Sequence, residues 1–458
     1  MKRMPRTAAF ASIVWWLLVP LFAVAGDGEL DPSFAGNGKE PVGFTSNGSA
    51  TPAIATAMLV QPDGKIVLAG YSGTTTLSTA LARLNPNGGL DDTFGGNGDG
   101  RVGGLFVKQA GVPDFAQAVA RQGDGKIVVF GQISNSGYVV RLTALGELDL
   151  TFDGDGKVLY PLVESGTVSF VAGAIMSNGN ILASGSYDAG SGGGPTLLNV
   201  LFDDTGQVLA AQNVSTVFSL DKGAMVMQPD GKAVIAVTGG AGNCNVIRDN
   251  VGAASLSLDG DFGIGGIATF GWNLGGDNVD YCYALALQRD GKILMGGQAR
   301  SDASGGSRAS ILRLLTGGTL DPGFGKKDFV FASGATGIPN IGTAILVQND
   351  QRIVLAGIAG TADPALEPQD FAALRLFTDG SLDATFTAST PGSSLGKVVF
   401  GFETGASGRT DTAFAAGLQG NRIVMAGYRE TSNSAKIAQF AIARLENNKV
   451  FADGFEAP

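Results

Sequence analysis

Residues 61–70 read Gln-Pro-Asp-Gly-Lys-Ile-Val-Leu-Ala-Gly, and this stretch decides the fold because versions of it recur along the chain. Pro62 presets one backbone angle, Asp63 can bond its own backbone, and Gly64 can adopt a positive φ, so the three predict a tight turn. The apolar, partly β-branched run that follows predicts a buried strand. Each copy of the phrase therefore predicts a β-hairpin.

The hairpin phrase occurs seven times, at intervals of about 60 residues. The further copies begin at Gln122, Ser177, Gln228, Gln288, Gln348 and Gln419, and the one at Ser177 is the weakest. A second phrase, clearest at residues 80–95, predicts another strand, an Asn-Pro-Asn-Gly turn and a Leu-Asp-x-x-Phe segment leading to the next unit. It returns at residues 141–152, 248–262, 313–324 and 375–386.

These repeats predict an all-β protein, which the 71 glycines also favour. Four strands in about 60 residues fit a propeller blade better than a solenoid coil, whose units are shorter. We therefore expect a single seven-bladed β-propeller with four-stranded blades. Six or eight blades remain alternatives, because the third repeat is weak.

The two ends of the repeat region predict how the ring closes. Residues 30–34 read Leu-Asp-Pro-Ser-Phe, the second half of the closing phrase, whereas residues 441–448 carry its first half and then break off. One unit is thus split between the two ends of the chain. We expect the propeller to span residues 26–450 and its last blade to be built from the N- and C-terminal segments together.

One strand position is repeatedly arginine, although a charge in an apolar strand is costly unless it is paired. The candidate partner is the aspartate of Leu-Asp-x-x-Phe. The expected pairs are Arg83 with Asp91, Arg141 with Asp149, Arg248 with Asp259, Arg313 with Asp321, Arg375 with Asp383, and Arg444 with Asp31. The third unit lacks both members. Salt bridges that fix each blade are the favoured interpretation, and a ring of charges for a ligand is the alternative.

The first 25 residues have the features of an export signal: Lys2, Arg3 and Arg6, an apolar run, and a small-x-small ending at Ala23-Val24-Ala25. An uncleaved membrane anchor is the alternative. Cleavage predicts a secreted protein (periplasmic, cell-surface or extracellular) with no membrane span. Loss of three basic residues leaves 28 of the 31 against 41 acids, a net charge of −13, which disfavours nucleic acid as a partner.

Cys244 and Cys282 are the two cysteines of the chain. In an oxidising compartment we expect them to form a disulfide, and two buried thiols are the alternative. The chain has no histidine, which removes histidine-based triads and the commonest general base. The best metal-like element is Asp153-Gly154-Asp155, where calcium could bind through carboxylate oxygens. A simple turn between strands is the favoured interpretation there.

The phrases at residues 30–34, 61–67 and 81–84 together resemble the delta-60 repeat family, bacterial exported propeller-type proteins of unknown function. The resemblance covers residues 30–448 and implies the propeller fold but no activity and no catalytic residue. The tail, residues 451–458, resembles a short ending found on some secreted bacterial proteins.

Two functions from different classes fit these observations. We expect a non-enzymatic, monomeric scaffold that binds an unknown protein or glycan through inter-blade loops, because those loops vary (residues 185–196 against 358–370) on a rigid frame. The alternative is a calcium-dependent hydrolase or lyase that uses carboxylates near the propeller axis.

Overall fold

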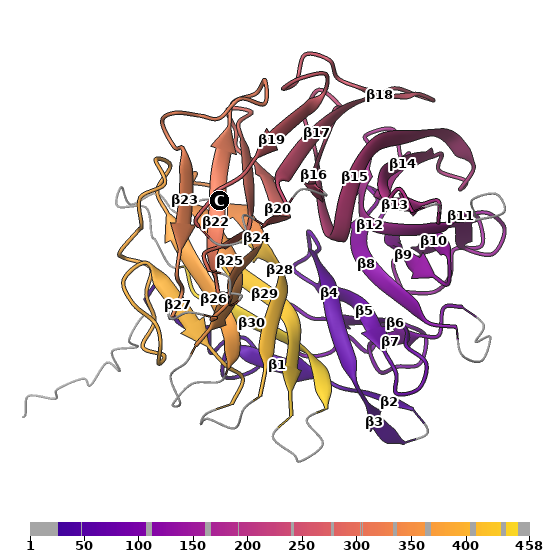
Figure 1. The fold of residues 1–458 in the computed structure, drawn as a ribbon. Helices are drawn as coiled ribbons and strands as arrows, with labels where there is room; N and C mark the ends of the chain where they lie inside the picture. Colours follow the sequence, from indigo (N-terminus) through magenta and orange to yellow (C-terminus); the bar gives the residue numbers. More distant parts are fainter. Residues whose placement is uncertain are drawn as a thin grey trace, which may run out of the picture.

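The computed structural model describes residues 26–46, 48–106, 112–160, 166–190, 192–239, 242–275, 279–302, 304, 306–332, 337–361, 368–403, 409–431 and 437–447. In these residues the chain forms seven four-stranded antiparallel sheets arranged as the blades of a propeller (Figure 1). No helix in this part of the chain is long and apolar enough to cross a membrane. The proposed export signal and the C-terminal tail lie outside the described residues.

Four blades follow one pattern, in which consecutive strands run from the axis to the rim. Blade 1 has β4 (Ala53–Val60), β5 (Ile66–Ser72), β6 (Ser78–Leu84) and β7 (Arg101–Gly103); blade 2 has β8 (Asp114–Arg121), β9 (Ile127–Ile133), β10 (Ser136–Leu142) and β11 (Lys157–Tyr160). Blade 5 has β20 (Asp280–Leu287), β21 (Ile293–Arg300), β22 (Ser307–Leu314) and β23 (Lys326–Phe329); blade 6 has β24 (Asn340–Val347), β25 (Ile353–Gly360), β26 (Gln369–Leu376) and β27 (Lys397–Phe400).

Blades 3 and 4 share one long strand. Blade 3 consists of β12 (Thr167–Ile175), β13 (Ile181–Asp188), β14 (Thr196–Phe202) and the first part of β15 (Val208–Met227). The second part of β15 is the inner strand of blade 4, beside β16 (Ala233–Gly239) and β17 (Cys244–Val251), on which β18 (Leu256–Leu258) and β19 (Ile267–Phe270) pair. The weak third repeat thus still forms a full blade, so the count is seven and the alternatives of six or eight are wrong.

Blade 7 is built from both ends of the described chain. It contains β28 (Asp411–Gln419), β29 (Arg422–Glu430), β30 (Ala438–Leu445) and the N-terminal strand β1 (Lys39–Val42), which pairs with β30 from Lys39 opposite Ala443 to Val42 opposite Phe440. A hairpin of β2 (Phe44–Ser46) and β3 (Ser49–Thr51) then leads into blade 1. The expected seven-bladed ring, closed by its two terminal segments, is confirmed.

Each pair of neighbouring blades encloses one apolar cluster. Between blades 1 and 2, for example, Val67 and Leu81 pack with Val129 and Val140, and all four side chains are fully buried. The inner strands β4, β8, β12, β15, β20, β24 and β28 contact one another in sequence around the axis, and β28 contacts β4 again. Because every sheet buries both faces against its neighbours, closing the ring leaves no blade with an uncovered apolar face.

The two ends of the ring differ in how much they repeat. The Pro-Asp-Gly turns, which join the first and second strands of each blade, all lie at one end, called here the turn face. The loops between the second and third strands, and the connections into the next blade, lie at the opposite end, called here the variable face. The described residues that flank the two varied segments, 185–196 and 358–370, belong to β13 and β14 and to β25 and β26, and these strands meet the variable face there.

Candidate functional site

The six arginines of the repeats each lie against an aspartate. The arginine Nε and aspartate Oδ2 atoms are 2.5 to 2.8 Å apart in the pairs Arg83–Asp91, Arg141–Asp149, Arg248–Asp259, Arg313–Asp321, Arg375–Asp383 and Arg444–Asp31. No arginine of the six is more than 7% exposed. Each guanidinium also lies over the ring of the phenylalanine that ends the Leu-Asp-x-x-Phe segment, 4.5 to 4.9 Å from its centroid.

The same arginines also reach the neighbouring blade. In five of them the Nη1 atom donates a hydrogen bond to a backbone carbonyl of the next blade; these are Arg83, Arg141, Arg248, Arg313 and Arg444. In Arg375 the Nη1 atom donates to the side chain of Asn447. These six arrangements are called the arginine clamps. Each clamp pairs a buried charge within its blade and bonds that blade to the next, as expected of a salt bridge that fixes the blade.

Five of the clamp carboxylates, those of Asp31, Asp91, Asp149, Asp259 and Asp321, have a pKa below the usual value. Burial alone would raise the pKa of Asp149, but hydrogen bonds from Thr151 and Lys126 and the charge of Arg141 outweigh it and lower the pKa to about 2. The pKa of Asp91 is likewise well below its usual value, because Lys65, Thr93 and Arg83 outweigh the effect of burial. These acids serve the frame and are not poised to donate or accept a proton near neutral pH.

The interface between blades 3 and 4 has a different arrangement. Leu201, fully buried, takes the strand position that holds the arginine elsewhere. Nearby, the Nδ2 of Asn199 donates a hydrogen bond of 2.6 Å to the Oδ2 of Asp249, and both residues are fully buried. Burial raises the pKa of Asp249 to about 7, although the bond from Asn199 works in the opposite direction. This interface thus carries a neutral amide against a carboxyl group where the others carry an ion pair.

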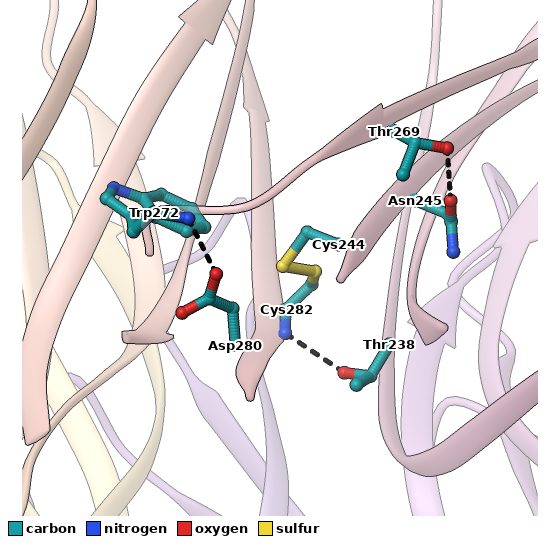
Figure 2. Close-up of a disulfide and its surroundings, with 7 residues drawn as sticks. All are labelled: Thr238, Cys244, Asn245, Thr269, Trp272, Asp280 and Cys282. Atoms are coloured by element: carbon teal, nitrogen blue, oxygen red, sulfur yellow. Dashed lines mark hydrogen bonds between the residues drawn. A yellow bond between two sulfur atoms is a disulfide. The ribbon is translucent and has the colours of Figure 1, made fainter. Parts of the chain in front are cut away.

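Cys244 and Cys282 are bonded to each other across the interface between blades 4 and 5 (Figure 2). Cys244 lies at the start of β17 and Cys282 in the inner strand β20, with Cα atoms 5.6 Å apart. Both cysteines are fully buried, and the backbone N–H of Cys282 donates to the Oγ1 of Thr238. The disulfide therefore staples two neighbouring blades.

The calcium candidates Asp153 and Asp155 lie in an exposed turn. The Oδ1 of Asp155 accepts the backbone N–H of Lys157 at 2.9 Å, and the Oδ1 of Asp153 accepts the Nε2 of Gln207 at 3.0 Å. No group of three or more histidine, cysteine, aspartate or glutamate side chains in the described part of the chain could hold a metal ion. Calcium binding at this turn stays a prediction.

The inner strands share a β-bulge that the repeated sequence phrases do not predict. In six of the seven blades, the pairing between the first and second strands skips one residue, which is a β-bulge. The bulged residues are Thr56, Gln117, Val171, Tyr283, Thr343 and Phe414. Blade 4 has a wider irregularity, between Ser219 and Ala224. The side chain at the bulge therefore varies between blades, with threonine in blades 1 and 6 and a different residue in each of the other four.

A repeated glycine makes each of these bulges possible. At the end of the second strand, a Cβ would lie 1.7 to 2.0 Å from the carbonyl oxygen two residues before the bulge, at Gly70, Gly131, Gly185, Gly297, Gly357 and Gly427. Any other residue would collide with that backbone oxygen. Blade 4 has Val237 at this position, opposite the wider irregularity. The glycine that ends the hairpin phrase thus leaves room for the carbonyl oxygen of the bulged strand.

Five of the six bulged residues, all except Val171, line a cavity of about 440 Å³ on the propeller axis. The other lining residues are Ile54, Ile341, Ile358, Tyr71 and Tyr428, so that blades 1, 2, 5, 6 and 7 all contribute. Lining positions lie early in the first strands and late in the second strands, so the cavity lies toward the variable face. Among the lining residues that the structure describes, none has a charged side chain.

The sequence did not reveal this cavity, because the residues that line it belong to no repeated motif. The available signal was the glycine after Ile-Val-Leu-Ala, which shows that another backbone comes close at that point. Repetition is visible in a sequence, whereas a position that carries threonine in two blades and a different side chain in each of four others is not.

The fold and the clamps define the chain as a seven-bladed β-propeller. Four of its segments, 61–94, 122–152, 288–324 and 348–386, match the model of the family described as "Domain of unknown function (DUF5122) beta-propeller". The match supports a propeller repeat family of unknown function, and assignment to the delta-60 family in particular stays a prediction. No curated protein matches this chain in sequence.

Similar solved structures include the polysaccharide lyase Uly1, at 8% identity and a TM-score of 0.46 over 92% of this chain and 97% of that one. The Pan2 WD40 domain of Neurospora crassa matches at 9% identity and a TM-score of 0.45, over 91% of this chain and 97% of that one. A mutant NanB sialidase of Streptococcus pneumoniae matches at 8% identity and a TM-score of 0.44, over 89% of this chain and 71% of that one.

Proposed function

We propose that this protein is an exported, non-enzymatic propeller that binds a protein or glycan at its variable face, through the axial cavity and the inter-blade loops of that face. One observation carries the proposal. The repeated charged residues serve the ring as clamps and turns, whereas the residues that differ between blades, those at the bulges, converge on one cavity. A rigid frame that presents variable side chains in a concave site is the usual arrangement of a binding protein.

The calcium-dependent hydrolase or lyase is the competing function, and it needs carboxylates that face the axis. Three inner strands begin with an aspartate, but each accepts a hydrogen bond from the backbone of a neighbouring segment: Asp114 from Thr79, Asp280 from Trp272, and Asp411 from Phe402. None of the three lines the axial cavity. Binding without turnover therefore fits the lining better than acid–base chemistry does.

Binding at the cavity can be tested with a variant that fills it. Ile54→Trp adds a large side chain to the lining, and Ile264→Trp, at a position that is 90% exposed, is the matched control. Wild type and both variants would be screened by calorimetry against neutral and charged glycans and against peptides, with and without calcium. We expect at least one ligand to bind wild type and Ile264→Trp but not Ile54→Trp, with no cleavage product.

Two results would contradict the proposal. Binding that survives in Ile54→Trp would place the ligand elsewhere on the molecule. Calcium-dependent cleavage of a bound glycan would favour the hydrolase or lyase instead.

A further inference from the structure

We infer that the axial cavity takes a neutral saccharide, with hydroxyl groups that bond the lining and a flat C–H face that packs on aromatic rings. This inference rests on the proposed function, since it names the class of ligand for the same site. It follows from three properties of the described lining residues: their lack of charge, their unpaired polar groups and their aromatic rings.

The absence of charge in the lining selects against ionic ligands. The ten lining side chains in the described part of the chain are aliphatic, aromatic, hydroxyl or amide groups. A carboxylate, phosphate or ammonium group that entered the cavity would lose its hydration without gaining an opposite charge, which is unfavourable. A ligand of this cavity is therefore uncharged in the part that enters it.

Three polar groups in the lining lack a protein partner. The hydroxyls of Tyr71 and Tyr428 and the amide of Gln117 make no hydrogen bond to any residue that the structure describes. The two threonine hydroxyls are used differently, because Thr56 donates to the Ala116 carbonyl at 2.6 Å and Thr343 to the Ala413 carbonyl at 2.9 Å. These bonds link neighbouring inner strands, so the phenols and the amide are the groups left for a ligand.

Those unpaired groups select against a purely apolar ligand. Covering two phenols and an amide with hydrocarbon would remove their water without replacing its hydrogen bonds. Phenol and amide groups can both donate and accept, as sugar hydroxyls can. Burial, together with the nearby Tyr428, raises the pKa of Tyr71, so this phenol keeps its proton at any physiological pH.

The aromatic rings supply the remaining contact. The rings of Phe414 and Tyr428 lie 6.0 Å apart and only 32° from parallel, and Tyr283 stacks on Tyr281 at 5.9 Å and 7°. Such rings bury apolar surface while their polar tips stay available for hydrogen bonds. A pyranose ring has a matching form, with C–H groups on its faces and hydroxyls on its rim. The cavity volume of about 440 Å³ suits a small molecule and not a folded partner.

The test is calorimetric titration of the protein with cellobiose, maltose, lactose and N,N′-diacetylchitobiose, and with galacturonic acid and glucosamine as charged probes. The variants are Tyr71→Phe, Tyr428→Phe and Gln117→Leu, each removing one of the unpaired polar groups. Tyr160→Phe, on the outer strand of blade 2, is the control. We expect a neutral disaccharide to bind, each cavity variant to weaken it about threefold to tenfold, and the control to have no effect.

The outcomes separate this inference from the function beneath it. If no neutral saccharide binds, or if one binds all three variants as tightly as wild type, the inference is wrong. If a peptide or a charged ligand binds wild type and is lost in Ile54→Trp, the binding function stands and the saccharide assignment falls. If no binding of any kind is lost in Ile54→Trp, both fall. Because Tyr71→Phe and Tyr428→Phe each remove a single atom, they test the inference even if Gln117→Leu fails to fold.

Discussion

Replacing Asp31 with alanine tests whether the ring depends on its N-terminal segment. The Oδ2 of Asp31 lies 2.6 Å from the Nε of Arg444 and 2.8 Å from the Nε of Arg422, and its Oδ1 accepts the backbone N–H and the hydroxyl of Ser33. Asp31 is fully buried and Arg444 is 5% exposed. The substitution would therefore leave a buried guanidinium without its carboxylate.

The expected magnitude follows from that burial. Removing one partner of a buried ion pair costs about 3–5 kcal/mol, because the remaining charge has lost its counter-ion but not its desolvation. Asp91 holds the same place in blade 1, where Arg83 approaches within 2.5 Å and Lys65 within 2.8 Å. Asp31→Ala and Asp91→Ala should thus destabilise the protein by similar amounts, although Asp31 is separated from Arg444 by nearly the whole chain.

Urea unfolding of the mature protein, followed by circular dichroism, would measure both free energies. Asp63→Ala is the control, since Asp63 is exposed and only accepts a backbone N–H within its own turn; we expect it to cost no more than about 1 kcal/mol. If Asp31→Ala unfolds at the wild-type midpoint while Asp91→Ala loses several kcal/mol, the N-terminal segment does not hold the ring closed and the reasoning fails.

Three further results are expected. Gly357→Ala should destabilise the protein by about 3 kcal/mol or more in the same urea assay, because its Cβ would lie 1.8 Å from the Ile341 carbonyl oxygen. Gly317→Ala, which has open space around it, is the control and should cost about 1 kcal/mol or less. Equal effects would show that the bulge does not require this glycine. Burial raises the pKa of Asp249 to about 7, so the stability that the protonated carboxyl contributes is complete below about pH 4 and is lost as the pH rises toward 7. The free energy of unfolding should change by up to about 4 kcal/mol over this range. Asp249→Asn should flatten that part of the curve of stability against pH, and an unchanged slope would show that Asp249 is ionised in the fold. Reducing the disulfide, whose cysteines are 38 residues apart, should lower the unfolding free energy by about 4 kcal/mol without abolishing the fold. Loss of the native circular dichroism spectrum on reduction alone would show that the whole fold, and not only the contact between blades 4 and 5, depends on the disulfide.

The sequence was sufficient to predict the fold because the physical signals of a blade are local and repeated. Pro62-Asp63-Gly64 and its relatives mark a turn, and the apolar run after it marks a strand. Even the third repeat keeps the apolar strand residues that a blade needs, since Leu182 and Val200 are fully buried. What is weak there is the turn and the clamp, and neither is required for a sheet to form.

The hydrogen bonds from the arginines to the neighbouring blade could not be predicted in the same way. The eight-residue separation of Arg83 and Asp91 shows which carboxylate the arginine faces within its own unit. Its second contact, with the Ala144 carbonyl, depends on how closely one blade packs on the next. That distance is set by the clusters of apolar side chains between blades, and no local pattern encodes it. The axial cavity escaped prediction for a related reason, since it depends on backbone geometry at Gly70 and its equivalents.

The one interface without a clamp shows why clamps are used elsewhere. Five interfaces join blades whose strands are linked by a loop, and a clamp from one blade to the next limits their relative motion. Blades 3 and 4 are instead joined by β15, a single strand of 20 residues that belongs to both sheets. Because β15 pairs with β14 along its first part and with β16 along its second part, it links these two blades directly, and the interface can dispense with the ion pair.

The seventh interface, where blade 7 meets blade 1, has more such contacts than the interface between blades 3 and 4. There the chain supplies the outer strand β1 from its far end, and Arg444 bonds both Asp31 and the Pro86 carbonyl of blade 1. This clamp joins three segments, and so does the clamp of Arg375, which bonds Asp27 as well as Asp383 and Asn447. The ring is therefore tied most heavily where its chain begins and ends, and least where the chain itself bridges two blades.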